Sequence, residues 1–395
     1  MVSKFNGPPG GAIVLALLLC AAFALSYLDD RSLAFSFVLG IVSGIVFQRG
    51  RFCFYCNVND FLEHRQASGL VAILVALAAG GLLYAVVFSA WLPTPSPGAL
   101  PPGAHIGPVG ITLAAGAFVF GIGMELSGSC LSAHFYRLGE GAFGSLVALG
   151  GAALGFLLGF NTWNALYLAE VHDDPVVWLP HALGYSGSLV LQGLILLALA
   201  AYVIRNAAQP AEGMAPGATQ VRRAPAIHNL LFERWPPAVT GLLVGVISAV
   251  AYLRVGPLGV TAEMGSLVRM AASPYGLAPQ DLLGLDVLRG CVSVLRETML
   301  SKNGLFVAGL IAGSFASALA SRQFNPHVPG RGGLANRFAG GLLLGWGAMT
   351  SLGCTVGVLL SGIHAAAASG WVFLLCALAG LVSARGAKSL FQAVR

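Results

Sequence analysis

The stretch that decides the fold is Gly121-Ile-Gly-Met-Glu-Leu-Ser-Gly-Ser-Cys130, and its skeleton returns in the second half of the chain as Gly345-Trp-Gly-Ala-Met-Thr-Ser-Leu-Gly-Cys354. Two glycines, the serine and the cysteine fall in the same register in both copies. In each copy an apolar run ends in a Gly/Ser-rich break, and a second apolar run follows. This pattern is typical of a membrane helix that is interrupted partway through the bilayer.

The composition indicates an all-α polytopic membrane protein. Of 395 residues, 57% are hydrophobic and only 9% are charged, and the mean hydropathy is +0.81. The apolar runs recur at membrane-spanning length and do not alternate at period two, which excludes a β-barrel. No basic cluster is interleaved with aromatic residues, so the net charge of +6 is a topological signal and no nucleic-acid partner is expected. The expected surroundings are a lipid bilayer.

The distribution of Lys and Arg predicts which loops face the cytoplasm. We expect helices at about 11–28, 33–47, 69–91, 143–160, 186–204, 304–320 and 370–384, and broken segments at 109–138 and 338–364 with breaks at 127–130 and 351–354. Basic loops at 49–65, 205–236, 321–337 and 385–395 should face inside, whereas 91–108 and 161–185 carry no Lys or Arg and should face outside. Both termini are then cytoplasmic. Segment 254–302 carries both charge signs and is interpreted as re-entrant or interfacial.

A second match extends the repeat. The run from Gly245 to Arg254 repeats the run from Gly40 to Arg49. The first broken pair has both flanks outside and the second has both inside, which predicts inverted-topology repeats with a central site near mid-membrane. The expected organisation is an N-terminal helix (1–32), a first repeat (33–185), a connecting helix and cytoplasmic linker (186–236), a second repeat (237–384) and a cytoplasmic tail (385–395).

Cys130 and Cys354 are the main candidate site residues. A break exposes backbone N–H groups at the start of the following half-helix, and these cradle an anion. In apolar surroundings we expect each thiol to stay neutral and to donate to a soft anionic sulfur. The alternative is a small residue needed only for packing. The neighbouring residues Ser127, Gly128, Ser351 and Gly353 are secondary candidates.

Cys53 and Cys56 form a C-x-x-C at the expected cytoplasmic mouth. The pair could be a redox pair, half of a metal site or a coincidence. No second C-x-x-C or histidine pair completes a zinc site, so no metal or cofactor is expected.

Other chemistry-bearing residues are less decisive. Glu125 inside the first broken helix suggests a proton site or a structural anchor, or a side chain bonded to backbone freed by the break. His134 and His364 are out of register and are interpreted as surface or packing residues. Cys20 and Cys376 lie in plain apolar runs and are interpreted as inert.

The motifs Gln48-Arg-Gly-Arg-Phe-Cys53-Phe, Gly121-x-Gly…Ser-Gly-Ser-Cys130 and Gly345-x-Gly…Ser-Leu-Gly-Cys354-Thr-Val-Gly resemble the YeeE/YedE family of sulfur transporters. The resemblance implies an hourglass-like bundle of inverted repeats in the bacterial inner membrane. It also implies uptake of thiosulfate, which touches successive cysteines along a central path and is relayed to a TusA-like sulfurtransferase. The matching cysteines are Cys130 and Cys354, whose order along the path the sequence leaves open, and Cys53 on the cytoplasmic side.

Several residues depart from the family pattern. Cys56 and Cys291 are additional cysteines, and Leu258 stands where the second repeat could have mirrored Cys53. These departures leave the substrate open among thiosulfate, sulfite, another sulfur oxyanion and a selenium analogue.

The sequence therefore supports a transporter of thiosulfate or a related sulfur anion, drawn in by basic residues of 254–302. Two alternatives remain: a membrane thiol redox or sulfur-relay enzyme using Cys53 and Cys56, and a non-transporting component of a sulfur-metabolism complex. The chain has no G-x-x-x-x-G-K-[ST] motif, which argues against ATP-driven transport by this chain.

Overall fold

The computed structural model describes residues 7–28, 31–96, 98–208, 233–256, 259–285 and 301–393. The regular elements of this part of the chain are helices, and nine of them are long and apolar enough to cross a membrane. The all-helical membrane fold is confirmed. The linker residues 209–232, Leu258 and Cys291 lie outside the described residues.

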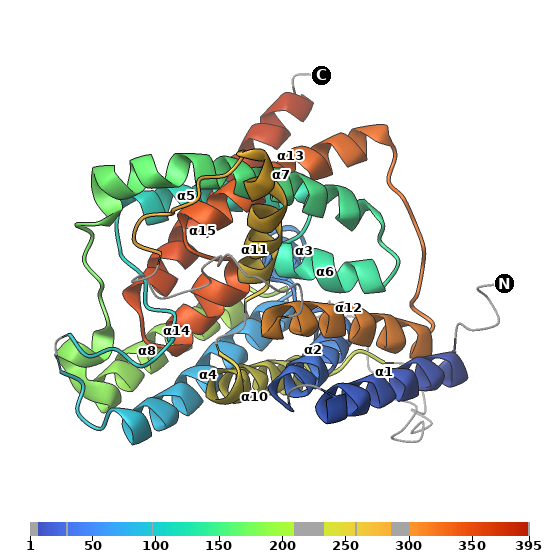
Figure 1. Cartoon of the computed structure of the whole chain (residues 1–395), viewed down its shortest axis with the longest axis horizontal. Coiled ribbons are helices and arrows are strands. Elements are labelled where there is room, and N and C mark those ends of the chain that lie inside the picture. The colour runs from blue at the N-terminus through green and yellow to red at the C-terminus, as the bar shows by residue number, and fades with distance from the viewer. Residues whose placement is uncertain are drawn as a thin grey trace.

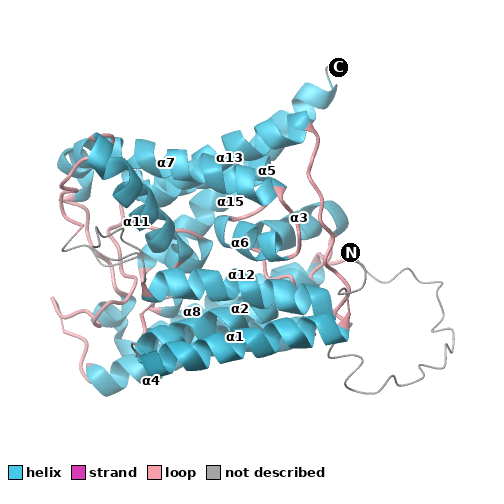
Figure 2. Ribbon diagram, turned by 45° about the vertical axis from the view of Figure 1, so that its right-hand side comes forward, coloured by secondary structure: helices cyan, strands magenta, loops and turns pink. Residues whose placement is uncertain are grey.

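The long helices form two groups that run in the same general direction, with short elements between them (Figures 1 and 2). One group contains α5 (Ile111–Ser127), α7 (Gly144–Leu166), α13 (Arg331–Thr350) and α15 (Ala368–Ala393). The other contains α1 (Pro8–Leu28), α2 (Arg31–Gly50), α4 (Ser68–Trp91), α8 (Leu179–Arg205), α10 (Pro237–Arg254) and α12 (Lys302–Ala320). The short elements include α3 (Phe54–His64), α6 (Leu131–Gly139), α11 (Val260–Ala272), the π-helix η4 (Thr355–Ser361) and α14 (Gly362–His364).

Both helix breaks fall where the sequence places them. Helix α5 ends at Ser127 and α6 follows after the left-handed Gly128, at φ 77°. Helix α13 ends at Thr350, and the segment after the break is bent from it by 44°. Gly353, at φ 153°, lies within this second break. A positive φ suits glycine because it has no Cβ, which explains a glycine in each break.

The repeated glycines make close contacts between helices. A Cβ on Gly121 would collide with the carbonyl of Ala377 in α15, and a Cβ on Gly345 would collide with the carbonyl of Ala152 in α7. Glycine is thus required at both positions for the backbones to approach.

The second glycine of each motif joins the two broken helices to each other. A Cβ on Gly123 of α5 would lie 2.8 Å from the carbonyl oxygen of Gly340 in α13. A Cβ on Gly347 of α13 would lie 2.6 Å from the carbonyl oxygen of Gly116 in α5. The two broken helices therefore pack closely against each other, with the end of α5 at Ser127 beside Gly340 of α13 and the end of α13 at Thr350 beside Gly116 of α5.

The helix pairs show a regular exchange. Helix α2 packs against α12 and α10 against α4, while α7 packs against α13 and α15 against α5. If α2, α4, α5 and α7 are matched in order with α10, α12, α13 and α15, the pair α2–α12 corresponds to α10–α4. In the same way, the pair α7–α13 corresponds to α15–α5.

Loops gather at two opposite ends of the bundle. At one end the Ala208 amide donates to the Arg65 carbonyl at 3.0 Å, and the Asn325 amide donates to the Glu140 carbonyl at 3.0 Å. At the other end the loops 92–110, 172–178 and 365–367 are joined by bonds such as Leu179 N–H to the Ala366 carbonyl, at 3.0 Å. This second set of loops carries no Lys or Arg.

Several expected boundaries were wrong. Helix α7 continues to Leu166, the π-helix η2 (Tyr167–Val171) follows it, and α8 begins at Leu179, so the expected loop 161–185 shrinks to 172–178. The extended part of α7 is held by bonds to a distant segment, because Asn161 donates to the Leu277 carbonyl at 2.9 Å and Asn164 donates to the Asp281 carbonyl at 3.0 Å. Residues 54–64, which were expected in a loop, are helical, and a helix at 260–272 lies within the segment interpreted as re-entrant or interfacial. The last helix runs to Ala393, so Arg385 and Lys388, which were expected in the tail, lie on α15.

Candidate functional site

The three principal candidate cysteines each stand immediately before a helix. Cys53 is the N-cap of α3, Cys130 the N-cap of α6 and Cys354 the N-cap of η4. All three are buried, with exposed fractions of 1%, 3% and 0%. Each of these cysteines has an extended backbone, as is usual for the residue that precedes a helix.

Cys53 lies beside Cys130, and Ser132 links this pair to Cys354; these three cysteines are called the row of thiols. The Sγ atoms of Cys53 and Cys130 lie 4.0 Å apart. Ser132 on α6 continues the row, because its Oγ lies 3.6 Å from the Sγ of Cys354. The structure thus brings together three cysteines that are far apart in the sequence.

A cavity lies beside this row. Its walls are mostly aromatic and aliphatic, and its polar groups are Cys130, Ser132 and Thr355. Ser129, the residue before Cys130, has its hydroxyl oxygen 3.6 Å from the Cys53 sulfur. Thiols and hydroxyls are weak or rotatable donors, which can bind an anion from several directions.

Cys56 lies beyond Cys53, with the two Sγ atoms 2.9 Å apart. Arg137 of α6 donates to the Cys56 sulfur at 3.2 Å and to the Gly128 carbonyl at 3.2 Å. Among the residues that the structure describes, no carboxylate forms an ion pair with Arg137. Sequence reasoning missed Arg137, although its position seven residues after Cys130 places it near the mouth.

A second cavity lies on the other side of the α13 break. It is lined by polar groups that include His105, Thr112, Asp174, Thr350, Ser351 and Ser369. His105 is 1% exposed, and burial lowers its pKa to about 4, so the imidazole is neutral at pH 7. Its Nδ1 has no partner among the described residues. Sequence reasoning missed His105, because nothing in a Pro/Gly-rich loop indicates that it folds inward.

Ser127 and Ser351 occupy equivalent positions at the breaks. Ser127 Oγ donates to the Ser129 carbonyl at 3.0 Å, whereas Ser351 Oγ donates back to the Gly347 carbonyl at 2.6 Å. Ser127 thus bonds within its break, and Ser351 bonds to the last turn of α13. Both residues shape the breaks.

Comparison with known proteins identifies the family. A family model described as sulphur transport matches residues 49–383, which is most of the chain. The chain belongs to this family. It is 26% identical over 373 residues to a protein named thiosulfate transporter TsuA from Escherichia coli K12, covering 88% of this chain and 92% of the relative. It is also 26% identical over 352 residues to a TsuA of Spirochaeta thermophila, covering 85% and 92%.

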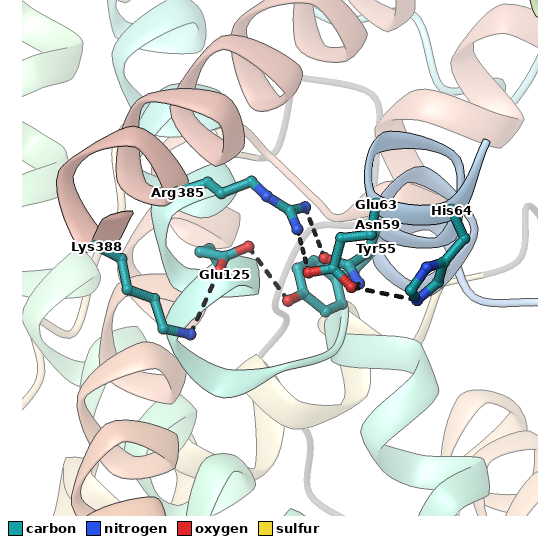
Figure 3. Close-up of polar contacts among 7 residues, drawn as sticks. All are labelled: Tyr55, Asn59, Glu63, His64, Glu125, Arg385 and Lys388. Atoms are coloured by element: carbon teal, nitrogen blue, oxygen red, sulfur yellow. Dashed lines mark hydrogen bonds and ion pairs between the residues drawn. The ribbon is translucent and has the colours of Figure 1, made fainter. Parts of the chain in front are cut away.

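In this member of the sulphur-transport family, Glu125 belongs to a network that ties three helices together (Figure 3). Glu125 of α5 is 7% exposed. It accepts a hydrogen bond from the Tyr55 hydroxyl at 3.2 Å, and Lys388 of α15 lies 3.7 Å away. Arg385 donates to Asn59 of α3 at 2.8 Å and also pairs with Glu63. These contacts with side chains of α3 and α15 fit the interpretation of Glu125 as a structural anchor.

The two histidines in the half-helices are buried, so a surface role is wrong for both. His364 donates from Nε2 to the Ala76 carbonyl at 3.0 Å, which leaves Nδ1 to accept from the Ser248 hydroxyl at 3.0 Å. His134 has Nδ1 3.2 Å from the Ser145 hydroxyl. These bonds fit the packing interpretation.

The remaining candidates are dispersed. Cys20 is exposed on α1 and Cys376 is half-buried on α15, and within the part of the chain that the structure describes neither forms a hydrogen bond with Cys53, Cys130 or Cys354. Arg269, one of the basic residues of 254–302, is 7% exposed and donates to the Gln280 carbonyl.

Proposed function

We propose that this protein takes up thiosulfate or a related sulfur-containing anion across the bacterial inner membrane, through a central path lined by Cys354, Cys130 and Cys53. The observation that carries the proposal is the buried row of these three thiols, with one cavity on each side of the Cys354 break. A path that crosses the centre of a bundle at two helix breaks is the usual architecture of a membrane transporter.

The chemistry of the row suits a soft anion. A neutral S–H donates a weak hydrogen bond to sulfur, and hydroxyls such as Ser132 and Thr355 can donate to oxygen. Several weak sites in succession allow an ion to enter and to leave, whereas one strong cationic site would hold it. The path thiols therefore favour passage of a sulfur anion over tight binding.

The positions of the basic loops indicate how the path is oriented in the membrane. Basic loops prefer the cytoplasm, so the end that carries the loops 49–65 and 321–337 is inside and both termini are cytoplasmic. The cavity beside His105 then opens from the periplasmic side, and Cys53 is the last of the three path thiols before the cytoplasm. A TusA-like sulfurtransferase is the proposed acceptor at that mouth.

The hourglass is proposed to consist of two inverted repeats, 33–185 and 237–384. The support is that equivalent glycines meet equivalent helices and that helix pairs exchange when the halves are matched. A thiol enzyme would need only the Cys53 and Cys56 pair, and it leaves the glycine symmetry and the Cys354 cavity unexplained.

The test is uptake of radiolabelled thiosulfate into proteoliposomes by the purified protein and by Cys53→Ala, Cys130→Ala and Cys354→Ala. A lost hydrogen bond to a charged ligand costs about 2 kcal/mol, so each variant should lose roughly tenfold or more of the uptake rate. The matched control is Cys376→Ala, a half-buried cysteine within the continuous helix α15, which should transport like the wild type.

Full uptake by all three path variants would contradict the proposal that the anion passes along these cysteines. Absence of uptake by the wild type in a folded, reduced preparation would contradict transport by this chain alone. Competition by sulfite and selenium analogues then identifies the preferred anion.

A further inference from the structure

Cys53 and Cys56 are placed for reaction with each other. They occupy the N-cap and the third residue of α3, and the Cys56 amide donates to the Cys53 sulfur at 3.4 Å. Their sulfurs are already 2.9 Å apart on one side of the helix turn. A disulfide bond needs about 2.05 Å, so closure requires a side-chain shift of roughly 1 Å and no change of fold.

The surroundings favour oxidation of this pair over the neighbouring one. The Cys56 thiol donates to the Cys53 sulfur, and Arg137 donates to the Cys56 sulfur at 3.2 Å, so these contacts hold the two sulfurs beside each other. Cys56 is also the most accessible of the clustered thiols, because it is half-buried whereas Cys53 and Cys130 are buried. Cys130 lies farther from Cys53, at 4.0 Å, and receives no such donor from Arg137.

We propose that Cys53 and Cys56 form a reversible disulfide when they meet a low-molecular-weight disulfide such as oxidised glutathione, and that this bond closes the inner end of the path. The inference rests on the proposed function, because it assigns Cys53 two uses. As a thiol it contacts the passing anion, and as half of a disulfide it has no S–H to donate.

The reaction balances without another reagent. The Cys56 thiolate attacks one sulfur of the small disulfide, forms a mixed disulfide and releases one small thiolate. The Cys53 sulfur then attacks Cys56 Sγ and releases the second small thiolate. Two protein thiols are oxidised, one small disulfide is reduced to two thiols, and the two protein protons pass to the leaving thiolates.

The test uses the full-length protein in proteoliposomes, reduced with dithiothreitol or treated with oxidised glutathione. A proteolytic peptide map without reductant detects the disulfide between Cys53 and Cys56. Thiosulfate uptake measures whether this disulfide blocks transport. The wild type should show the linked peptide and lose roughly tenfold or more of its uptake, as expected for loss of a donor to a charged ligand, and dithiothreitol should restore it. Cys56→Ser should transport like the reduced wild type under both conditions, and Cys376→Ser should behave as the wild type does.

Cys56→Ala is a second variant with the same expected insensitivity, in case the serine disturbs α3. Three results would overturn the gate: no linked peptide, a linked peptide with unchanged uptake, or loss of uptake by both Cys56 variants through a Cys53 to Cys130 bond. The peptide map does not depend on transport. Lack of uptake by reduced wild type therefore counts against the transport proposal and its gate, while the linkage is judged by the map.

Discussion

At the scale of single residues, the buried imidazole of His105 in the loop 92–110 should make the stability of the protein depend on pH. His105 has a pKa of about 4 in the folded protein because burial disfavours the charged form, whereas an unfolded chain has a histidine pKa of about 6.5. The folded state therefore binds fewer protons than the unfolded state between these two values. Stability from this group is complete above about pH 6.5 and falls by up to about 3 kcal/mol as the pH approaches 4.

We expect the melting temperature of the protein in detergent to fall between pH 7 and pH 4.5, and to fall less steeply in His105→Gln. The measurement is tryptophan fluorescence during heating at each pH. Asp174 lines the same cavity, and burial raises its pKa. Because Asp174 titrates in both proteins, the difference in slope isolates His105. Identical slopes would show that His105 is solvated in the folded protein.

The sequence predicted the cysteines of the site but not their neighbours. Cys130 and Cys354 were recognisable because a repeated motif ends in each of them, and Cys53 because it follows a characteristic Arg-Gly-Arg-Phe run. Arg137 and His105 were not recognisable. Their positions depend on how α6 and the loop 92–110 fold back toward the breaks, and no local pattern reports such contacts.

At the scale of helices, the repeated glycines set how closely the bundle packs. Gly121→Ala and Gly345→Ala should each prevent assembly of α5 on α15 or of α7 on α13, because the new methyl group collides with a backbone carbonyl. Overpacking of this kind costs about 1–3 kcal/mol or more. Gly150→Ala is the matched control, since it lies on α7 with no atom within 4 Å of the added Cβ.

Size-exclusion chromatography of detergent extracts measures the outcome. The control should yield as much monodisperse protein as the wild type, and alanine in a helix can even stabilise by about 1 kcal/mol. Wild-type yields from Gly121→Ala and Gly345→Ala would mean that the helices are farther apart than the structure places them.

The existence of the long helices was predictable, because a continuous apolar run has few alternatives in a membrane. Their ends were less predictable. Asn161 reads as a loop residue in isolation, yet its amide bonds back into α7. Helix α3 was missed among polar residues, although Phe54, Val58 and Phe61 recur at helical spacing and form its buried face.

At the scale of the whole molecule, the proposed inverted repeat predicts which loops share a side. Thr94 lies in the loop 92–110 and is exposed. Val328 lies in the loop 321–330 and is 64% exposed. If the halves are inverted and the basic loops face the cytoplasm, a membrane-impermeant maleimide added to intact cells should label Thr94→Cys and spare Val328→Cys.

Permeabilised cells provide the control, because both cysteines should then react above the background of the wild-type protein. Comparing the two variants distinguishes a reversed orientation in the membrane from a repeat that is not inverted. Labelling of Val328→Cys alone in intact cells would keep the two ends of the bundle but reverse the proposed direction, placing Cys53 at the outer mouth. Labelling of both from outside would put the two loops on one side, and the repeat could then not be inverted, since its two breaks would enter the membrane from the same face.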